Sequence, residues 1–140
     1  MNIINSLTGM IDLIDNSLNK EEIANKIFFT EEILKKTFEN FHFYEIRTPA
    51  LEDTDLFKRS VGDTSDIVNK ELYSFQDKNE KSITLRPEGT ASVIRSIIEK
   101  KLDGDPQKLW YLGPMWRYER PQKGRYRQFN QAGVEILGYE

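Results

Sequence analysis

Residues 114–128, PMWRYERPQKGRYRQ, constrain the folding of this chain more than any other segment. Five cations fall within eleven positions that contain a single acid, Glu119; the cations are Arg117, Arg120, Lys123, Arg125 and Arg127. A Pro-Gln-Lys-Gly tetrad interrupts the run and predicts a turn between two strands. Arginine side chains on a strand-turn-strand can clamp a polyphosphate, because their planar forks match phosphate oxygens. The alternative is a surface hairpin whose cations are solvated.

The composition indicates a folded domain, or part of one, without thiol chemistry. The 140 residues carry a formal net charge of -3, and 38% of them are hydrophobic, which suffices for a modest core. There is no cysteine and one histidine, His42, which excludes disulfides, cysteine nucleophiles and thiolate metal sites, and we expect no metal site. No run approaches the ~18 apolar residues of a membrane span. No basic leader precedes an apolar segment, so a cytoplasmic protein is expected.

The order of the periodic segments predicts an α+β fold. Helices are expected at residues 20–40, at residues 54–60 with Gly62 closing the second, and after Thr90. The last helix is expected to bury Val93, Ile94, Ile97, Ile98 and Leu102. Strand-like runs lie at 43–47, 71–75, 81–85, 108–113, 114–119 and 127–138. Of these, 71–75 and 81–85 predict an antiparallel hairpin. No helix follows the last run to cover it, so we expect the N-terminal piece of a longer enzyme.

A second cluster, LRPEGT, occupies residues 85–90. Its Glu88 lies at a strand-to-helix transition, where the free N–H groups of the coming helix create a positive potential. One interpretation is that the carboxylate simply serves as the partner of that helix N-terminus. The other is that Glu88 accepts hydrogen bonds from a substrate ammonium, with the Thr90 hydroxyl helping. The sequence leaves both interpretations open.

A third cluster lies on the last strand-like run, where alternation separates two faces. One face carries Phe129, Gln131, Gly133 and Glu135, and the other carries Asn130, Ala132, Val134 and Ile136. Glutamine, glycine and glutamate make a poor core surface, and they suit a pocket floor on which Gly133 admits a ligand closely. Phe129 on the same face favours a site, since an aromatic ring can stack on a base. The alternative is a solvent-facing side of the strand.

In their order along the chain, these motifs resemble the N-terminal catalytic region of the histidyl-tRNA synthetases, a family of class II aminoacyl-tRNA synthetases. The resemblance begins near Gly9 and rests on EIRTP (45–49), RSVGDTSDIVNKELYSF (59–75), LRPEGTA (85–91) and LGPMWRYERPQKGRYRQFNQAGVE (112–135). It implies an antiparallel sheet flanked by helices and incomplete at the C-terminus. Residues 1–140 would then hold motifs 1 and 2 of the catalytic domain, while motif 3 and the anticodon-binding domain would be absent.

The resemblance also implies a role for each site residue. Arg117 would be catalytic, binding the α-phosphate of ATP and the histidine carboxylate. The rest of the ATP site would comprise Glu119, Arg125 and Phe129, which face the adenine side, the γ-phosphate and the adenine ring respectively. The histidine α-amino group would be held by Glu88, Thr90 and Gln131, Gly89 would also belong to the histidine site, and Glu135 would approach the imidazole. The tRNA acceptor end would meet Gln122 and Lys123.

The implied reaction is attack of the histidine carboxylate on ATP, giving histidyl-adenylate, followed by transfer to tRNA(His). Mg2+ would bridge phosphate oxygens, and the segment from the first long helix to Pro49 would form a homodimer interface. Activity of the truncated chain is expected to be weak or absent. Thr8, Asp15 and Asn130 depart from the usual family residues.

One alternative is the non-catalytic, histidine-binding regulatory subunit of ATP phosphoribosyltransferase, a relative that generally loses the ATP-handling residues. Another is a truncated, inert chain with only a dimerisation surface, which the sequence leaves open. The intact LRPEGT and RYERPQKGRYRQF segments favour the synthetase.

Overall fold

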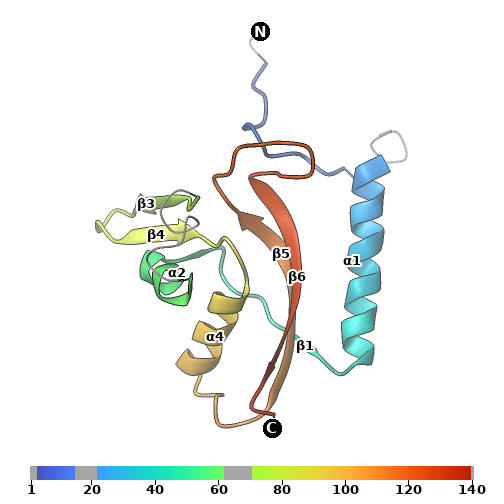
Figure 1. Cartoon of the computed structure of the whole chain (residues 1–140), viewed down its shortest axis with the longest axis vertical. Coiled ribbons are helices and arrows are strands. Elements are labelled where there is room, and N and C mark those ends of the chain that lie inside the picture. Colours follow the sequence, from blue (N-terminus) through green and yellow to red (C-terminus); the bar gives the residue numbers. More distant parts are fainter. Residues whose placement is uncertain (1–2, 15–21, 62–70, 140) are drawn as a thin grey trace.

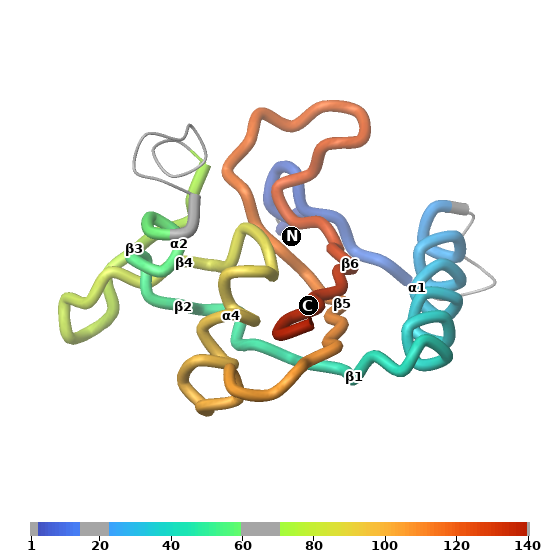
Figure 2. The backbone as a smooth tube through the Cα atoms, turned by 60° about the horizontal axis from the view of Figure 1, so that its bottom comes forward, coloured from blue at the N-terminus to red at the C-terminus, as the bar shows by residue number. Residues whose placement is uncertain are grey.

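The computed structural model describes residues 3–14, 22–61 and 71–139. A long antiparallel pair of strands, β5 (Gln107–Trp116) and β6 (Gln128–Leu137), runs through the middle of the molecule (Figure 1). Helix α1 (Glu22–Asn40) lies on one side of this pair and helix α4 (Thr90–Glu99) on the other, as Figure 2 shows from a second direction. The α+β fold predicted from the sequence is therefore confirmed.

A small second sheet lies on the α4 side of the molecule (Figure 1). It has the order β2-β4-β3 with antiparallel pairings; the strands are β2 (Leu51–Asp53), β4 (Ser82–Leu85) and β3 (Ser74–Gln76). The pairing of β3 with β4 confirms the predicted hairpin. Helix α2 (Thr54–Val61) follows β2 directly and confirms the expected short helix, while Gly62 lies outside the described residues.

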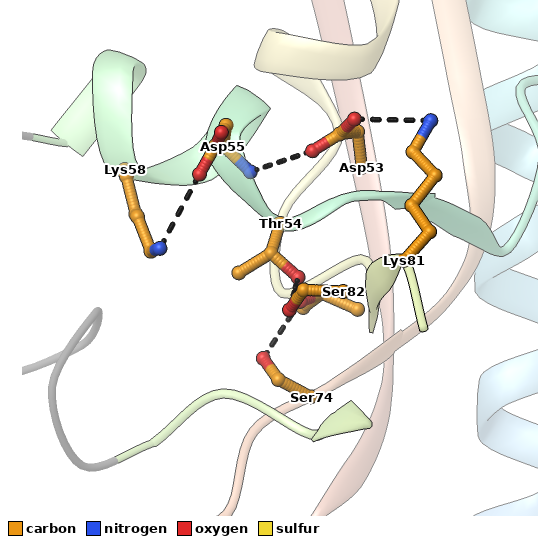
Figure 3. A network of polar contacts seen from close by, with 8 residues as sticks. Asp53, Thr54, Asp55, Lys58, Ser74, Lys81 and Ser82 are labelled. Carbon is orange, nitrogen blue, oxygen red and sulfur yellow. Dashed lines mark hydrogen bonds and ion pairs between the residues drawn. The ribbon is translucent and has the colours of Figure 1, made fainter. Parts of the chain in front are cut away.

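Hydroxyl groups join the strands of the small sheet to α2 (Figure 3). The Thr84 hydroxyl, fully buried, lies 2.7 Å from both Thr54 Oγ1 and Ser74 Oγ, and Thr54 also contacts Ser82 Oγ at 2.8 Å. The buried hydroxyls of Thr54 and Thr84 therefore each have a partner, which avoids the cost of an unsatisfied polar group.

The central sheet contains one parallel pairing. Strand β1 (Tyr44–Glu45) runs parallel to β5 and pairs with Leu109 and Trp110. The backbone N–H of Ile46 still donates to Trp110 O, at 2.9 Å, and the chain then crosses to β2. The resemblance implied an antiparallel sheet, and that expectation holds for the pairings of β5 with β6 and of β2, β3 and β4, but not for β1.

The interpretation of 108–113 and 114–119 as two strands is wrong, because β5 runs continuously through Pro114 and ends at Trp116. Proline cannot donate to a neighbouring strand, so it belongs at an unpaired edge. β1 pairs only as far as Trp110, and the edge of β5 at Pro114 therefore has no β1 ladder to interrupt. Residues 117–127 form the loop between β5 and β6.

The main core lies between α4 and the central pair of strands. It is formed by Val93, Ile97, Leu109, Tyr111 and Met115, with Ile46, Phe129 and Leu137 packed against it. The expected apolar stripe of α4 is only partly correct, because Ile98 is 61% exposed and Leu102 39% exposed. The face of α4 that meets the strands carries Val93 and Ile97, and the small residues Ala91, Ser92 and Ser96 are also buried.

Helix α1 packs on the other face of the central sheet through aromatic contacts. The ring of Phe38 lies 5.5 Å from that of Trp110, which is 2% exposed, and 6.5 Å from that of Phe43. The outward side of α1 exposes Phe29 and Ile33. Among the described residues, no helix has the length and apolarity needed to cross a membrane.

Candidate active site

The LRPEGT segment joins β4 to the N-terminus of α4. The Glu88 carboxylate accepts hydrogen bonds from the backbone N–H of Thr90 at 2.6 Å and of Ala91 at 3.0 Å. These bonds satisfy amide groups that have no partner within the helix, and the carboxylate also meets the positive end of the helix dipole. The interpretation of Glu88 as the partner of the helix N-terminus is thus confirmed. A carboxylate has about four lone-pair sites, so a second role as a ligand acceptor stays open.

The predicted face of β6 is the face that meets α4. The Gln131 side-chain oxygen accepts the Gly89 N–H at 2.9 Å, and the Thr90 hydroxyl donates to the Glu135 carboxylate at 2.7 Å. Phe129 packs against the core on this same side. Four predicted histidine-site residues, Gly89, Thr90, Gln131 and Glu135, are therefore joined by two direct hydrogen bonds.

Asn130 lies on the opposite face of β6, as alternation predicts. Its side-chain N–H donates to the Glu31 carboxylate of α1 at 2.5 Å. The side chain that departs from the family pattern at this position therefore contacts α1 and not the candidate site. Asp15, the second departure, lies outside the described residues.

Tyr111 is a member of this cluster that the sequence reasoning missed. A Cβ at Gly89 would lie 2.2 Å from the Tyr111 ring, and a Cβ at Gly133 would lie 2.4 Å from it. Both positions therefore require glycine. Burial raises the pKa of Tyr111, the Thr90 hydroxyl opposes that rise, and the carboxylates of Glu135 and Glu88 add to it. The phenol therefore stays neutral to a higher pH than that of an exposed tyrosine.

Arg117 follows β5 directly and lies beside the LRPEGT segment. Its Nε–H donates to the backbone oxygen of Pro87 at 2.9 Å, and its guanidinium lies 5.1 Å from the centre of the Phe129 ring. The predicted catalytic cation therefore contacts Pro87, the residue that directly precedes Glu88 in the chain. Phe129, predicted to stack on adenine, is already in cation–π contact with Arg117.

The loop after Arg117 arranges its cations around Glu119. One Glu119 carboxylate oxygen lies 3.9 Å from Arg117 Nη1 and the other lies 3.9 Å from Arg125 Nη1. Glu119 has a 19% exposed side chain, whereas that of Arg125 is 66% exposed. Three of the predicted ATP-site residues therefore form one ion-pair group, whose outer cation is open to solvent.

The remaining loop contacts hold its base rather than its tip. The Arg127 guanidinium stacks at 4.1 Å on the Tyr118 ring, and its backbone N–H donates to Gly9 O at 2.6 Å. At the tip, Gln122 and Arg125 exchange backbone hydrogen bonds around Lys123 and Gly124, which confirms the predicted turn. Gln122 and Lys123 are exposed, and in the part of the chain that the structure describes neither side chain bonds to the Glu88–Glu135 cluster.

The site has opposite charges at its two ends. Glu88 and Glu135 both contact Thr90, and among the described residues neither has a cation within ion-pair distance. Arg117 lies on the other side of Pro87. A zwitterion with an ammonium and a carboxylate group matches this arrangement, because each charge meets an opposite one.

Solved structures of similar shape define the class of protein. Superposition on the apo histidyl-tRNA synthetase of S. aureus gives a TM-score of 0.75 at 42% identity, covering 99% of this chain and 30% of that chain. A histidine–tRNA ligase subunit from Alicyclobacillus acidocaldarius gives a TM-score of 0.78 at 19% identity, covering 100% of this chain and 37% of the other, which shows the fold alone. The fold is that of the class II aminoacyl-tRNA synthetases.

Sequence comparison narrows the class to one family. The histidyl-tRNA synthetase family profile matches residues 18–140. Histidine–tRNA ligases of Desulfitobacterium hafniense and Staphylococcus carnosus are 61% and 60% identical over 79% and 82% of the chain. The chain belongs to the histidyl-tRNA synthetase family. It spans 26% and 28% of the length of these two relatives.

Proposed function

We propose that the chain is the histidine- and ATP-binding part of a histidine–tRNA ligase, containing motifs 1 and 2 of the catalytic domain. Motif 3 and the anticodon-binding domain would then belong to the parts of the relatives that this chain does not span. The observation that carries the proposal is that Arg117 bonds to Pro87, the residue before Glu88, while Glu88 and Glu135 both bond to Thr90 on the other side of Glu88 in the chain. A cation beside a pair of carboxylates suits the two charged groups of an amino acid.

In the proposed complex, each polar group of histidine meets one part of the site. The α-amino group lies against Glu88 and Thr90 beside the Gly89–Gln131 bond, and the imidazole approaches Glu135. Arg117 contacts the carboxylate and the α-phosphate of ATP. Buried polar groups built for the imidazole would stay unpaired with an apolar analogue, so such analogues are rejected strongly.

The proposed reaction needs positioning and charge neutralisation rather than a general base, because the histidine carboxylate is already a nucleophile. It attacks the α-phosphorus of ATP, forms histidyl-adenylate and expels pyrophosphate. A fixed cation aimed at the developing charge typically contributes ~3–4 kcal/mol. Arg117 is suited to this role because the Pro87 oxygen and the Phe129 ring hold its guanidinium.

The rest of the nucleotide is assigned to the loop. Arg125 reaches the γ-phosphate, Glu119 faces the adenine side, and Phe129 supports the adenine ring. Magnesium would be held through the oxygens of the nucleotide phosphates. Within the described residues, no cluster of three or more His, Asp or Glu side chains offers a metal site of its own.

The proposed partners follow from the exposed parts of the chain. Gln122 and Lys123 at the loop tip would meet the acceptor end of tRNA(His), and backbone neutralisation by the loop cations would make that contact depend on salt. A second copy would cover the apolar side chains exposed near motif 1, such as Phe29 at 65% and Tyr44 at 75%. Charging of tRNA by such an enzyme would take place in the cytoplasm.

The second candidate function is that of the regulatory subunit of ATP phosphoribosyltransferase. One structural neighbour, from Bacillus halodurans, bears a title naming such a subunit or a histidyl-tRNA synthetase, but at 24% identity it shows the fold alone. The cluster of Arg117, Glu119 and Arg125 favours the synthetase, since a protein that only binds histidine needs no phosphate clamp.

Histidine-dependent exchange of pyrophosphate into ATP separates these functions. We expect weak exchange by the chain and a loss of roughly 10²–10³-fold in Arg117→Ala. Lys78→Ala, which removes an exposed cation in the β3–β4 turn, serves as the control and should leave exchange unchanged. Histidine binding without exchange would favour the regulatory subunit, and the absence of both would rule out the proposal.

A further inference from the structure

Arg86 carries a partly buried guanidinium that none of the proposed substrate contacts uses. Its Nη1 donates to Thr48 O at 2.7 Å and to Thr48 Oγ1 at 3.0 Å, and its Nε donates to Pro114 O at 3.1 Å. Burial lowers its pKa and the Glu52 carboxylate opposes that shift from a distance, since among the described residues no carboxylate lies within ion-pair distance of the guanidinium. A cation held only by neutral acceptors loses hydration without the return of an ion pair. Its place therefore calls for a reason other than charge pairing.

The guanidinium occupies the edge of β5 that β1 leaves unpaired. Beyond the bond from Ile46 N to Trp110 O, the chain turns away from β5 toward the small sheet. Arg86 then bridges the gap between Thr48 and Pro114. A Cβ at Gly113 would lie 2.9 Å from Arg86 Nη2, so the glycine makes room for the side chain. The Arg86 side chain therefore makes hydrogen bonds at this edge where a paired strand would otherwise make them.

The backbone of Arg86 joins the same two segments. Its N–H donates to Ala50 O at 2.9 Å, and its oxygen accepts the Trp116 N–H at 3.0 Å. The next residue, Pro87, accepts the Nε–H of Arg117 at 2.9 Å. Arg86 therefore joins the LRPEGT segment, which contains Glu88, to the end of β5, which leads into Arg117.

We infer that Arg86 is a positioning residue, which sets the spacing between the Arg117 guanidinium and the carboxylate end of the site. The inference rests on the proposed function for its chemical meaning. The spacing itself is a property of the chain and can be measured without a substrate. A displacement of about 1 Å in such a site can cost on the order of 10²-fold in rate.

The first test is the side-chain Nε–H resonance of Arg117, followed by 1H–15N NMR in the intact chain. We expect the wild-type resonance to be protected from exchange with water by the bond to Pro87 O. In Arg86→Gln and Arg86→Lys, that resonance should shift and lose protection. A lysine keeps the charge but cannot reach Thr48 and Pro114 together.

The matched control is Arg95→Gln. Arg95 is also partly buried, with a 29% exposed side chain. It forms an ion pair with Glu52 at 2.7 Å and has no contact with Arg117. Its loss should lower thermal stability and leave the Arg117 resonance unchanged. If Arg86→Gln fails to fold, Arg86→Lys and Gly113→Ala, which crowds Arg86 Nη2, carry the test. An unchanged Arg117 resonance in folded Arg86 variants would overturn the inference.

Calorimetric titration with histidine measures how the Arg86 variants affect the affinity of the chain for the proposed substrate. We expect Arg86→Lys to weaken histidine binding by roughly 10- to 100-fold, while Arg95→Gln stays within about twofold because the side-chain partners of Arg95 are Glu52 and Glu99, not residues of the proposed site. If the wild-type chain binds no histidine, the proposed function fails, and the Arg117 resonance still decides the role of Arg86. Equal losses in the Arg86 and Arg95 variants would contradict a positioning role.

Discussion

Single residues determine how closely the walls of the candidate site approach one another. The Tyr111 ring lies between Gly89, at the start of α4, and Gly133, in the middle of β6. Neither glycine has a positive φ, so space rather than backbone conformation requires them. The ring thereby separates the Gln131 and Glu135 hydrogen bonds to α4 while supporting both.

Gly133→Ala tests this packing. The new Cβ would lie 2.4 Å from atoms of the buried Tyr111 ring, so the ring or the strand has to shift. We expect the free energy of unfolding to fall by about 1–3 kcal/mol, measured by urea denaturation. Gly104→Ala is the control, because a Cβ there meets nothing within 4 Å. Equal stability of the two variants would mean that the site is looser than described.

The ionisation of Tyr111 predicts a dependence of stability on pH. Because its pKa is raised in the folded chain, the unfolded chain releases the phenol proton first, near pH ~10. The contribution of this group to the free energy of unfolding therefore does not change with pH below that range, and it decreases as the pH rises through it. Urea midpoints between about pH 8.5 and 10.5 should therefore fall less steeply in Tyr111→Phe than in the wild type. Parallel curves would show that the phenol is not perturbed.

Secondary-structure elements are joined by polar contacts as well as by the core. In the small sheet, the buried Thr84 hydroxyl connects β4 to both α2 and β3 through Thr54 and Ser74. Thr84→Val keeps the shape and removes the shared partner. We expect a loss of about 1–2 kcal/mol in the free energy of unfolding.

Ser74→Ala provides the comparison for Thr84→Val. Ser74 is exposed, so water can replace its partner and the expected loss is within about 0.5 kcal/mol. Chemical denaturation of both variants measures the difference. A Thr84→Val variant as stable as Ser74→Ala would mean that the hydroxyl chain contributes nothing to the small sheet.

The elements also show which features can be predicted from the sequence. Alternation along a strand depends on local geometry, and it correctly placed Gln131 and Glu135 on one face of β6. Tyr111 was missed because its role depends on the absence of side chains at Gly89 and Gly133, which meet it only through tertiary packing. Arg86 was missed for the same reason, since its acceptors lie in two distant segments. Pro114 was misinterpreted because its effect depends on where β1 ends.

At the scale of the whole molecule, the β5–β6 pair carries the site and the flanking elements hold its two ends. Arg117 extends from the end of β5, whereas Glu88 belongs to the segment between the small sheet and α4. The distance between the charged ends of the site therefore depends on both sheets.

The central claim is that the α4 face of β6 binds histidine. Titration calorimetry with histidine tests it directly, comparing the wild-type chain with Glu135→Gln and with Glu99→Gln, which removes a 66% exposed carboxylate of α4. We expect binding that Glu135→Gln weakens by at least roughly tenfold, the effect of losing a hydrogen bond to a charged group, and that Glu99→Gln leaves unchanged. No binding, or an affinity that Glu135→Gln does not alter, would contradict the claim.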